Sequence, residues 1–134
     1  MRITATIEKG KDNLYSVYSD DHIGNSYFGG FGDTAKEARE DFEDSVREAL
    51  QEGMERGDNV PSIEEIVFTY KYDLRSLFSY FDFINASKLA SYAGINESKM
   101  RQYKAGTAFP GSRTTAKIER AIHRIGEEFI SLQL

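Results

Sequence analysis

The sequence contains no cysteine and no tryptophan, and it has only two prolines and two histidines among its 134 residues. Without cysteine the chain forms no disulfide framework, no thiolate zinc site and no thiol nucleophile. No apolar run approaches the roughly 20 residues that a membrane-spanning helix needs. Met1-Arg2 leads directly into alternating, strand-like sequence, so no signal peptide is expected. These absences favour a cytoplasmic protein with no membrane partner.

Charge is abundant and unevenly distributed along the chain. Residues 1–83 hold 9 Lys and Arg against 18 Asp and Glu, whereas residues 84–134 hold 8 against 4. The two parts therefore carry net charges of −9 and +4, which together give the overall −5. An acidic body suits a basic partner, and a basic C-terminal third suits an anionic polymer. The acids within residues 37–55 are explained mostly as the solvated face of a helix.

The first seventy-two residues predict three strands, one long helix and a fourth strand. Apolar and polar residues alternate over 3–7, and turn residues at 10–13 separate them from further strands at 15–17 and 27–31. Thr34 and Glu37 have the spacing of a capping box, which predicts a helix start. Residues 66–72 are β-branched and aromatic, as in a strand. The order βββαβ, with the helix on one face of an antiparallel sheet, predicts an α+β domain. The helix stripe consists of Ala35, Ala38, Phe42, Val46, Ala49 and Leu50.

The rest of the chain predicts an all-α bundle. After Tyr72 the hydrophobic period changes from two to about three and a half and remains helical to the end. We therefore expect two domains, residues 1–72 and 73–134, which meet near Lys71–Arg75 without a long flexible linker. No internal repeat or low-complexity segment is present.

Residues 87–106 predict two short helices joined by a tight turn. Leu89 and Ala90 face inward on the first helix, Gly94 ends it in the left-handed conformation, and Asn96 caps the second. The motif Leu-Ala-x-x-Ala-Gly-Ile-x-x-Ser occupies residues 89–98. This segment resembles the helix-turn-helix of the Cro/repressor (Xre-like) family. A following helix is expected to complete the bundle with Ile118, Ala121, Ile122, Ile125 and Phe129.

The resemblance implies that the second short helix enters the major groove of double-stranded operator DNA. Its polar face away from Met100 and Tyr103 then meets the base edges, where Gln bonds adenine and a carboxylate accepts from cytosine. Cationic side chains and the start of the next helix contact phosphates instead. The expected base contacts are Glu97, Ser98 and Gln102, and the expected phosphate contacts are Lys99, Arg101, Lys104, Arg113 and Thr114.

The N-terminal half, followed as it is by a helix-turn-helix, resembles the HicB antitoxins. The family's Tyr-x-Val strand, aspartate-bearing loop, Gly-x-Thr-x-x-Glu-Ala helix start and Ala-Leu helix end occur at 15–17, 20, 32–38 and 49–50. Two departures concern the toxin-facing loop. Ser19 stands where proline usually precedes the aspartate, and the family's Pro-Gly pair is reduced to Ile23-Gly24.

This second resemblance implies a partial ribonuclease H-like βββαβ domain that binds and neutralises a small, basic, RNA-cleaving toxin (HicA). It also implies that the chain represses its own operon as a homodimer or larger homo-oligomer. The excess of acid in the N-terminal part agrees with a cationic partner. The expected toxin contacts are Asp20, Asp21, Tyr27, Phe28 and Asp33, and Phe109, Ile130 and Leu132 are available for self-association.

Other functions remain open on the sequence. A metal-dependent nuclease would need a convergent set of acids, for which Glu8, Asp20 and Asp21 are the candidates. His22 and His123 lie in different domains without an evident nucleophile, so we expect no enzyme, no cofactor and no resident metal. A stand-alone regulator with a ligand-sensing acidic domain is the main alternative. A third alternative is an interaction module that has lost DNA binding. Glu97 supports this alternative, because a negative charge is unfavourable near phosphates.

Overall fold

The computed structural model describes all residues from Met1 to Leu134 and divides the chain into two compact units. Unit 1 comprises residues 1–80 and unit 2 comprises residues 81–134. Unit 1 is α+β and unit 2 contains only helices, so the sequence predicts these two classes of structure correctly. None of the helices combines the length and apolarity needed to cross a membrane.

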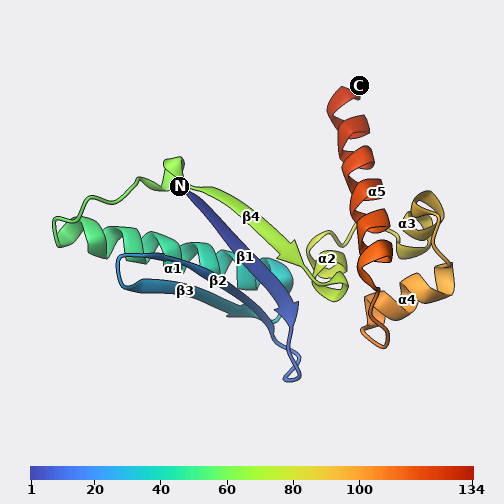
Figure 1. Ribbon diagram of the computed structural model, residues 1–134, viewed down its shortest axis with the longest axis horizontal. Coiled ribbons are helices and arrows are strands. Elements are labelled where there is room, and N and C mark those ends of the chain that lie inside the picture. The colour runs from blue at the N-terminus through green and yellow to red at the C-terminus, as the bar shows by residue number, and fades with distance from the viewer. The chain divides into compact units, whose positions relative to one another are not determined.

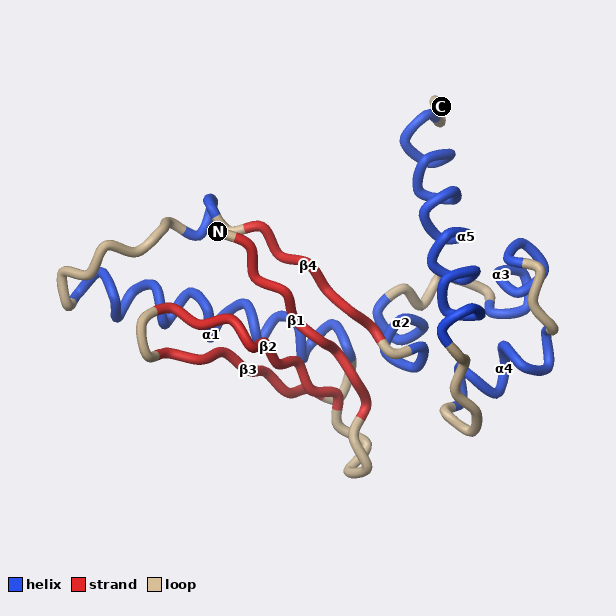
Figure 2. Tube along the Cα trace, in the orientation of Figure 1, coloured by secondary structure: helices blue, strands red, loops and turns tan.

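A four-stranded mixed sheet with the strand order β3-β2-β1-β4 forms the base of unit 1 (Figure 2). The elements are β1 (Arg2–Lys9), β2 (Tyr15–Ile23), β3 (Ser26–Gly32), α1 (Ala35–Glu55), a 3₁₀ turn (Ile63–Glu65), β4 (Val67–Tyr72) and α2 (Leu74–Tyr80). The first three strands form antiparallel pairs, but β4 runs parallel to β1. The expectation of a purely antiparallel sheet is therefore wrong. The reason is that α1 carries the chain from edge strand β3 across to the opposite edge, so β4 runs in the same direction as β3.

Helix α1 lies along one face of the sheet (Figure 1) and starts as the capping signal predicts. The Thr34 hydroxyl accepts from the Glu37 amide at 3.1 Å, while the Glu37 carboxylate accepts from the Asp33 amide at 3.1 Å. The return bond therefore goes to Asp33 rather than to Thr34. The whole apolar stripe is buried as expected, with Phe42 at its centre against the ring of Phe28, 6.2 Å between centroids.

Two glycines of β3 let α1 approach the sheet closely. A Cβ on Gly30 would lie 2.5 Å from the Ala38 carbonyl oxygen and closer still to the Phe42 nitrogen. A Cβ on Gly32 would lie 2.6 Å from the Ala38 nitrogen. Since real Cβ atoms do not approach backbone this closely, the helix position depends on glycine at both places.

Helix α2 belongs to unit 1, so the boundary lies after Tyr80 and not after Tyr72 as expected. It packs against α1, β1 and β4. The Asp73 carboxylate accepts from the Ser76 amide at 2.8 Å and from the Lys9 amide at 3.2 Å, which fastens the start of α2 to the end of β1. Near its other end, the Ser79 hydroxyl accepts from the Ala35 amide at 3.2 Å. These bonds hold α2 on the sheet domain despite its helical period.

Unit 2 consists of α3 (Ala86–Ala93), α4 (Glu97–Ala105) and α5 (Ser112–Ser131). Its small core contains Ala86, Leu89, Ala90, Met100, Ile118 and Ala121. Helix α5 contributes to this core only with its first half. Ile122 and Ile125 are half-buried, and Phe129 is 60 % exposed. The expectation that Phe129 completes the bundle is therefore wrong, because α5 continues beyond the helices that pack on it.

Candidate functional site

The turn between α3 and α4 fixes where α4 begins. Gly94 adopts the left-handed conformation with φ 72° and ψ 36°, and the Ile95 amide donates back to the Ala90 carbonyl at 2.8 Å. The Asn96 side-chain oxygen then accepts from the Lys99 amide at 3.0 Å. Both features match the sequence prediction. A left-handed glycine followed by an asparagine cap reverses the chain within three residues and holds α4 against α3.

Helix α4 buries Met100 completely and presents a polar surface on its other sides. Residues four apart share a face of a helix, so Ser98 aligns with Gln102 and Glu97 aligns with Arg101. Glu97 and Arg101 form an ion pair with 3.8 Å between carboxylate oxygen and guanidinium nitrogen, and both side chains are more than half exposed. An exposed pair of this kind contributes little to stability. All three expected base contacts thus lie outside the core, with Ser98 and Glu97 exposed and Gln102 half-buried.

The expected phosphate contacts lie on α4 and on the first turn of α5. Lys99, Arg101 and Lys104 are exposed on α4, while Arg113 is exposed and Thr114 half-buried on α5. No side chain caps the start of α5, whose first helical bond runs from the Thr115 amide to the Gly111 carbonyl. Unit 2 carries 8 Lys and Arg against 5 Asp and Glu. The basic side chains expected to contact phosphates are therefore all exposed to solvent on α4 and α5.

The residues expected to contact a toxin do not share one surface. Phe28 is 5 % exposed in the core of unit 1, so its burial removes it from the contact set. Asp21 accepts from the Thr4 amide at 2.8 Å and from the Ser19 hydroxyl at 3.3 Å, which makes it a link between β2 and β1. This link lies where the β2–β3 register shifts between Tyr18 and His22. Asp20, Tyr27 and Asp33 are exposed.

Sequence reasoning missed two exposed aromatic residues, Tyr18 and Phe31. Alternation along a strand was the available signal. Since Val17 and Phe28 face the core, Tyr18 and residues 27, 29 and 31 point to the opposite face. The same rule forbids Tyr27 and Phe28 from lying on one surface.

A cluster of aromatic and charged side chains joins α1, β4 and α2. The Arg39 guanidinium lies 4.0 Å from the Tyr70 ring centroid and donates to the Tyr72 hydroxyl at 3.0 Å, while the Tyr70 hydroxyl donates to Glu43 at 2.5 Å. Burial raises the pKa of Tyr70, and its hydrogen bond to Glu43 raises it further. Burial likewise raises the pKa of Tyr72, against the opposing charge of Arg39. Burial alone would lower the pKa of Arg39, but Tyr72 and Glu43 outweigh it and raise that pKa. The cluster holds elements together and contains none of the expected site residues.

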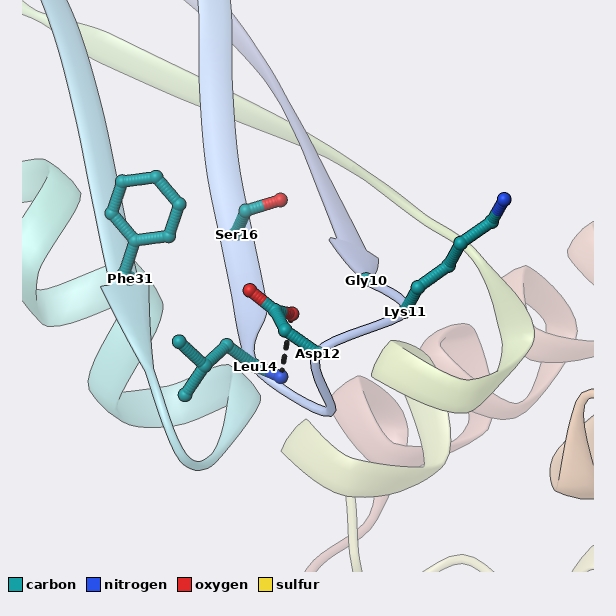
Figure 3. Close-up of a pocket in the computed structure, with 6 residues that line it drawn as sticks. All are labelled: Gly10, Lys11, Asp12, Leu14, Ser16 and Phe31. Carbon is teal, nitrogen blue, oxygen red and sulfur yellow. Dashed lines mark hydrogen bonds between the residues drawn. The ribbon is translucent and has the colours of Figure 1, made fainter.

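The acids considered for a metal site do not lie together in unit 1. No group of three or more His, Asp or Glu side chains is placed to hold a metal ion, so Glu8, Asp20 and Asp21 do not converge. A shallow hollow of about 300 Å³ lies at the β1–β2 hairpin (Figure 3). It is lined by Gly10, Lys11, Asp12, Leu14, Ser16 and Phe31.

No protein-family model, curated protein or solved structure matches this chain. No residue's role is therefore carried over from a relative. The observations that bear on function are the geometry of α3, α4 and α5 and the surface of unit 1.

Proposed function

We propose that this chain is a HicB-type antitoxin that binds operator DNA through α4 and a small, basic, RNA-cleaving toxin through unit 1. The observation that carries the proposal is the pair α3 and α4, joined by left-handed Gly94 and the Asn96 cap, with α4 exposing a polar and basic surface. This arrangement fits the helix-turn-helix plan, in which the second helix lies in the major groove.

In the proposed complex, α4 turns Ser98 and Gln102 toward base edges. Gln102 bonds adenine through its amide, and Glu97 accepts from a cytosine amino group. Lys99, Arg101 and Lys104 contact phosphates. Arg113 and Thr114 contribute the start of α5, where unpaired backbone amides favour an anion.

Operator binding by such a domain calls for two copies, and α5 offers a surface for self-association. Ile125 and Phe129 are four residues apart, so they share one side of α5, and Leu132 follows directly after the end of the helix. Phe129 is 60 % exposed, Leu132 is 56 % exposed, and Phe109 and Ile130 are also exposed. We propose that two copies of the chain bury these side chains against each other and so place two α4 helices on a two-fold symmetric operator.

The charge of unit 1 and the order of its elements support the proposed toxin binding. Unit 1 holds 17 Asp and Glu against 9 Lys and Arg, a net charge of −8. A toxin that binds RNA is cationic on its active surface, so this potential favours its capture. The βββαβ order with α1 on one face of the sheet is also that of the HicB domain.

DNA binding is tested by fluorescence anisotropy with a labelled duplex from upstream of the chain's own gene, titrated at several salt concentrations. The logarithm of affinity should fall linearly with the logarithm of salt, and Lys99→Ala or Lys104→Ala should each reduce the slope by about 0.9. Arg47→Ala, which removes an exposed cation from α1 of unit 1, is the matched control and should leave the slope unchanged. Equal affinity for the upstream and a scrambled duplex, or equal slopes for all variants, contradicts the proposal.

A stand-alone regulator is the second candidate, favoured by the hollow beside the β1–β2 hairpin. A small ligand in this hollow would contact Lys11, Asp12 and Phe31. Operator binding that changes with such a ligand, in a genome with no neighbouring gene for a basic protein, would support this candidate over the antitoxin.

A further inference from the structure

Three large aromatic side chains lie exposed on the face of the sheet opposite α1. Tyr18 on β2 is 45 % exposed, and Tyr27 and Phe31 on β3 are 69 % and 65 % exposed. Isolated exposed apolar residues are ordinary in soluble proteins, but a contiguous group marks a binding surface. Whether these three are contiguous depends on the strand register.

The register places Tyr18 diagonally between Tyr27 and Phe31 on this face, while Tyr27 itself pairs with His22 beyond the register shift and its ring lies 5.2 Å from the His22 ring. Tyr18 pairs with Gly29, which lies between Tyr27 and Phe31 on the same face of β3. Diagonal neighbours across a strand pair are within reach of aromatic rings. A Cβ on Gly29 would meet nothing nearer than the Val17 carbonyl at 3.8 Å, so the space above Gly29 is open to the neighbouring rings. We call Tyr18, Tyr27 and Phe31 the aromatic strip.

The outer edge of β3, next to the strip, is not free to pair with an added strand. The Phe31 amide donates to the Asp41 carboxylate at 2.9 Å, and the Gly29 amide donates to the Ser45 hydroxyl at 3.3 Å. Both amides point away from β2, so the side chains of α1 occupy the groups that would pair with an added strand. A partner therefore binds through side chains on the sheet face and not by extending the sheet at β3.

Charge selects the kind of partner. Carboxylates border the strip at Asp20 on β2, at Asp33 after β3 and at Asp41 on α1, whereas the hollow that reaches Phe31 is lined by one acid and one base, Asp12 and Lys11 (Figure 3). These acids repel nucleic acid, although exposed aromatic rings otherwise suit stacked bases. They equally disfavour a second copy of the same acidic unit. A basic protein is the partner whose charge complements this surface.

We propose that the aromatic strip is the surface on which unit 1 receives arginine and lysine side chains of a basic protein partner. The cationic groups lie over the rings of Tyr18, Tyr27 and Phe31 as cation–π contacts, and Asp20 and Asp33 pair with cations at the rim. The proposal deepens the antitoxin half of the proposed function and rests on it. It replaces buried Phe28 with Tyr18 and Phe31 in the contact surface.

The test is isothermal titration calorimetry of the full chain with the small basic protein encoded by the adjacent gene, in a form that does not cleave RNA. Tyr18→Ala and Phe31→Ala should each weaken binding by at least about tenfold, as expected for anchor residues. Val67→Ala is the matched control, since Val67 is 56 % exposed on the same face but on β4 at the far edge. It should leave the affinity within about twofold. All positions are exposed, and circular dichroism checks that each variant is folded.

The outcomes separate the surface from the function. Wild-type binding that Tyr18→Ala and Phe31→Ala weaken and Val67→Ala does not supports the aromatic strip. Wild-type binding that none of the variants weakens overturns the strip and leaves the antitoxin function standing. No wild-type binding overturns both. A single-stranded RNA 12-mer that binds wild-type chain but not Phe31→Ala would also overturn the proposal, in favour of a nucleic-acid surface.

Discussion

Replacing Gly30 with alanine should severely destabilise unit 1. The new Cβ would lie 2.5 Å from the Ala38 carbonyl oxygen and closer to the Phe42 nitrogen, and both are backbone atoms that no rotamer change can move. To restore an ordinary contact, α1 must retreat by roughly 1 Å, and a gap of that size forfeits a quarter to a half of each dispersion contact along it. Because Phe42 and Val46 of α1 are fully buried, we expect a loss of about 3 kcal/mol in the free energy of unfolding.

Gly29→Ala is the matched control, one residue along the same strand. Its Cβ meets nothing nearer than 3.8 Å, so the free energy of unfolding should change by less than about 0.5 kcal/mol. Urea denaturation followed by far-ultraviolet circular dichroism measures both variants against the wild type. A Gly30→Ala protein as stable as the wild type, or a Gly29→Ala protein equally damaged, would refute the close approach of α1 to β3.

Three further predictions concern other elements. Asn96→Ala removes the cap of α4 and should lower the free energy of unfolding of unit 2 by about 1 kcal/mol in urea titrations. An unchanged free energy of unfolding would contradict the role of Asn96 as a cap. The pKa of Tyr70 is raised above its ordinary 10.0 by burial and by Glu43, so the neutral form favours the fold. The contribution of Tyr70 to the stability of the wild type should therefore be constant below about pH 10 and be lost as the pH rises further. In alkaline denaturation the stability of Tyr70→Phe should fall less steeply with pH than that of the wild type. An equal fall of stability with pH in the two proteins would contradict this. Phe129→Glu should convert a homodimer into a monomer in light scattering, and a monomeric wild type would remove α5 as the dimer surface.

Local signals in the sequence predicted much of the fold correctly. The apolar stripe of α1, its start at Thr34, the left-handed Gly94 and the Asn96 cap all depend on residues within one helical turn of each other. Side-chain periodicity does not specify which neighbour an element packs against. That is why the parallel pairing of β4 and the attachment of α2 to unit 1 were not predicted.

The candidate sites show the same division. Exposure of α4 followed from its helical period, whereas Asp20 and Asp21 were expected in a loop and lie on strand β2. Alternation alone would have separated Tyr27 from Phe28. The role of Asp21 depends on the amide of Thr4, seventeen residues away in sequence, and no local pattern indicates such a bond.

The most direct test of the antitoxin function is the growth of cells that produce the small basic protein of the adjacent gene, with and without this chain. We expect arrest without the chain and rescue with it, with the two proteins recovered as one complex. Arrest that the chain does not relieve, or rescue without a complex between the two proteins, would contradict the antitoxin function.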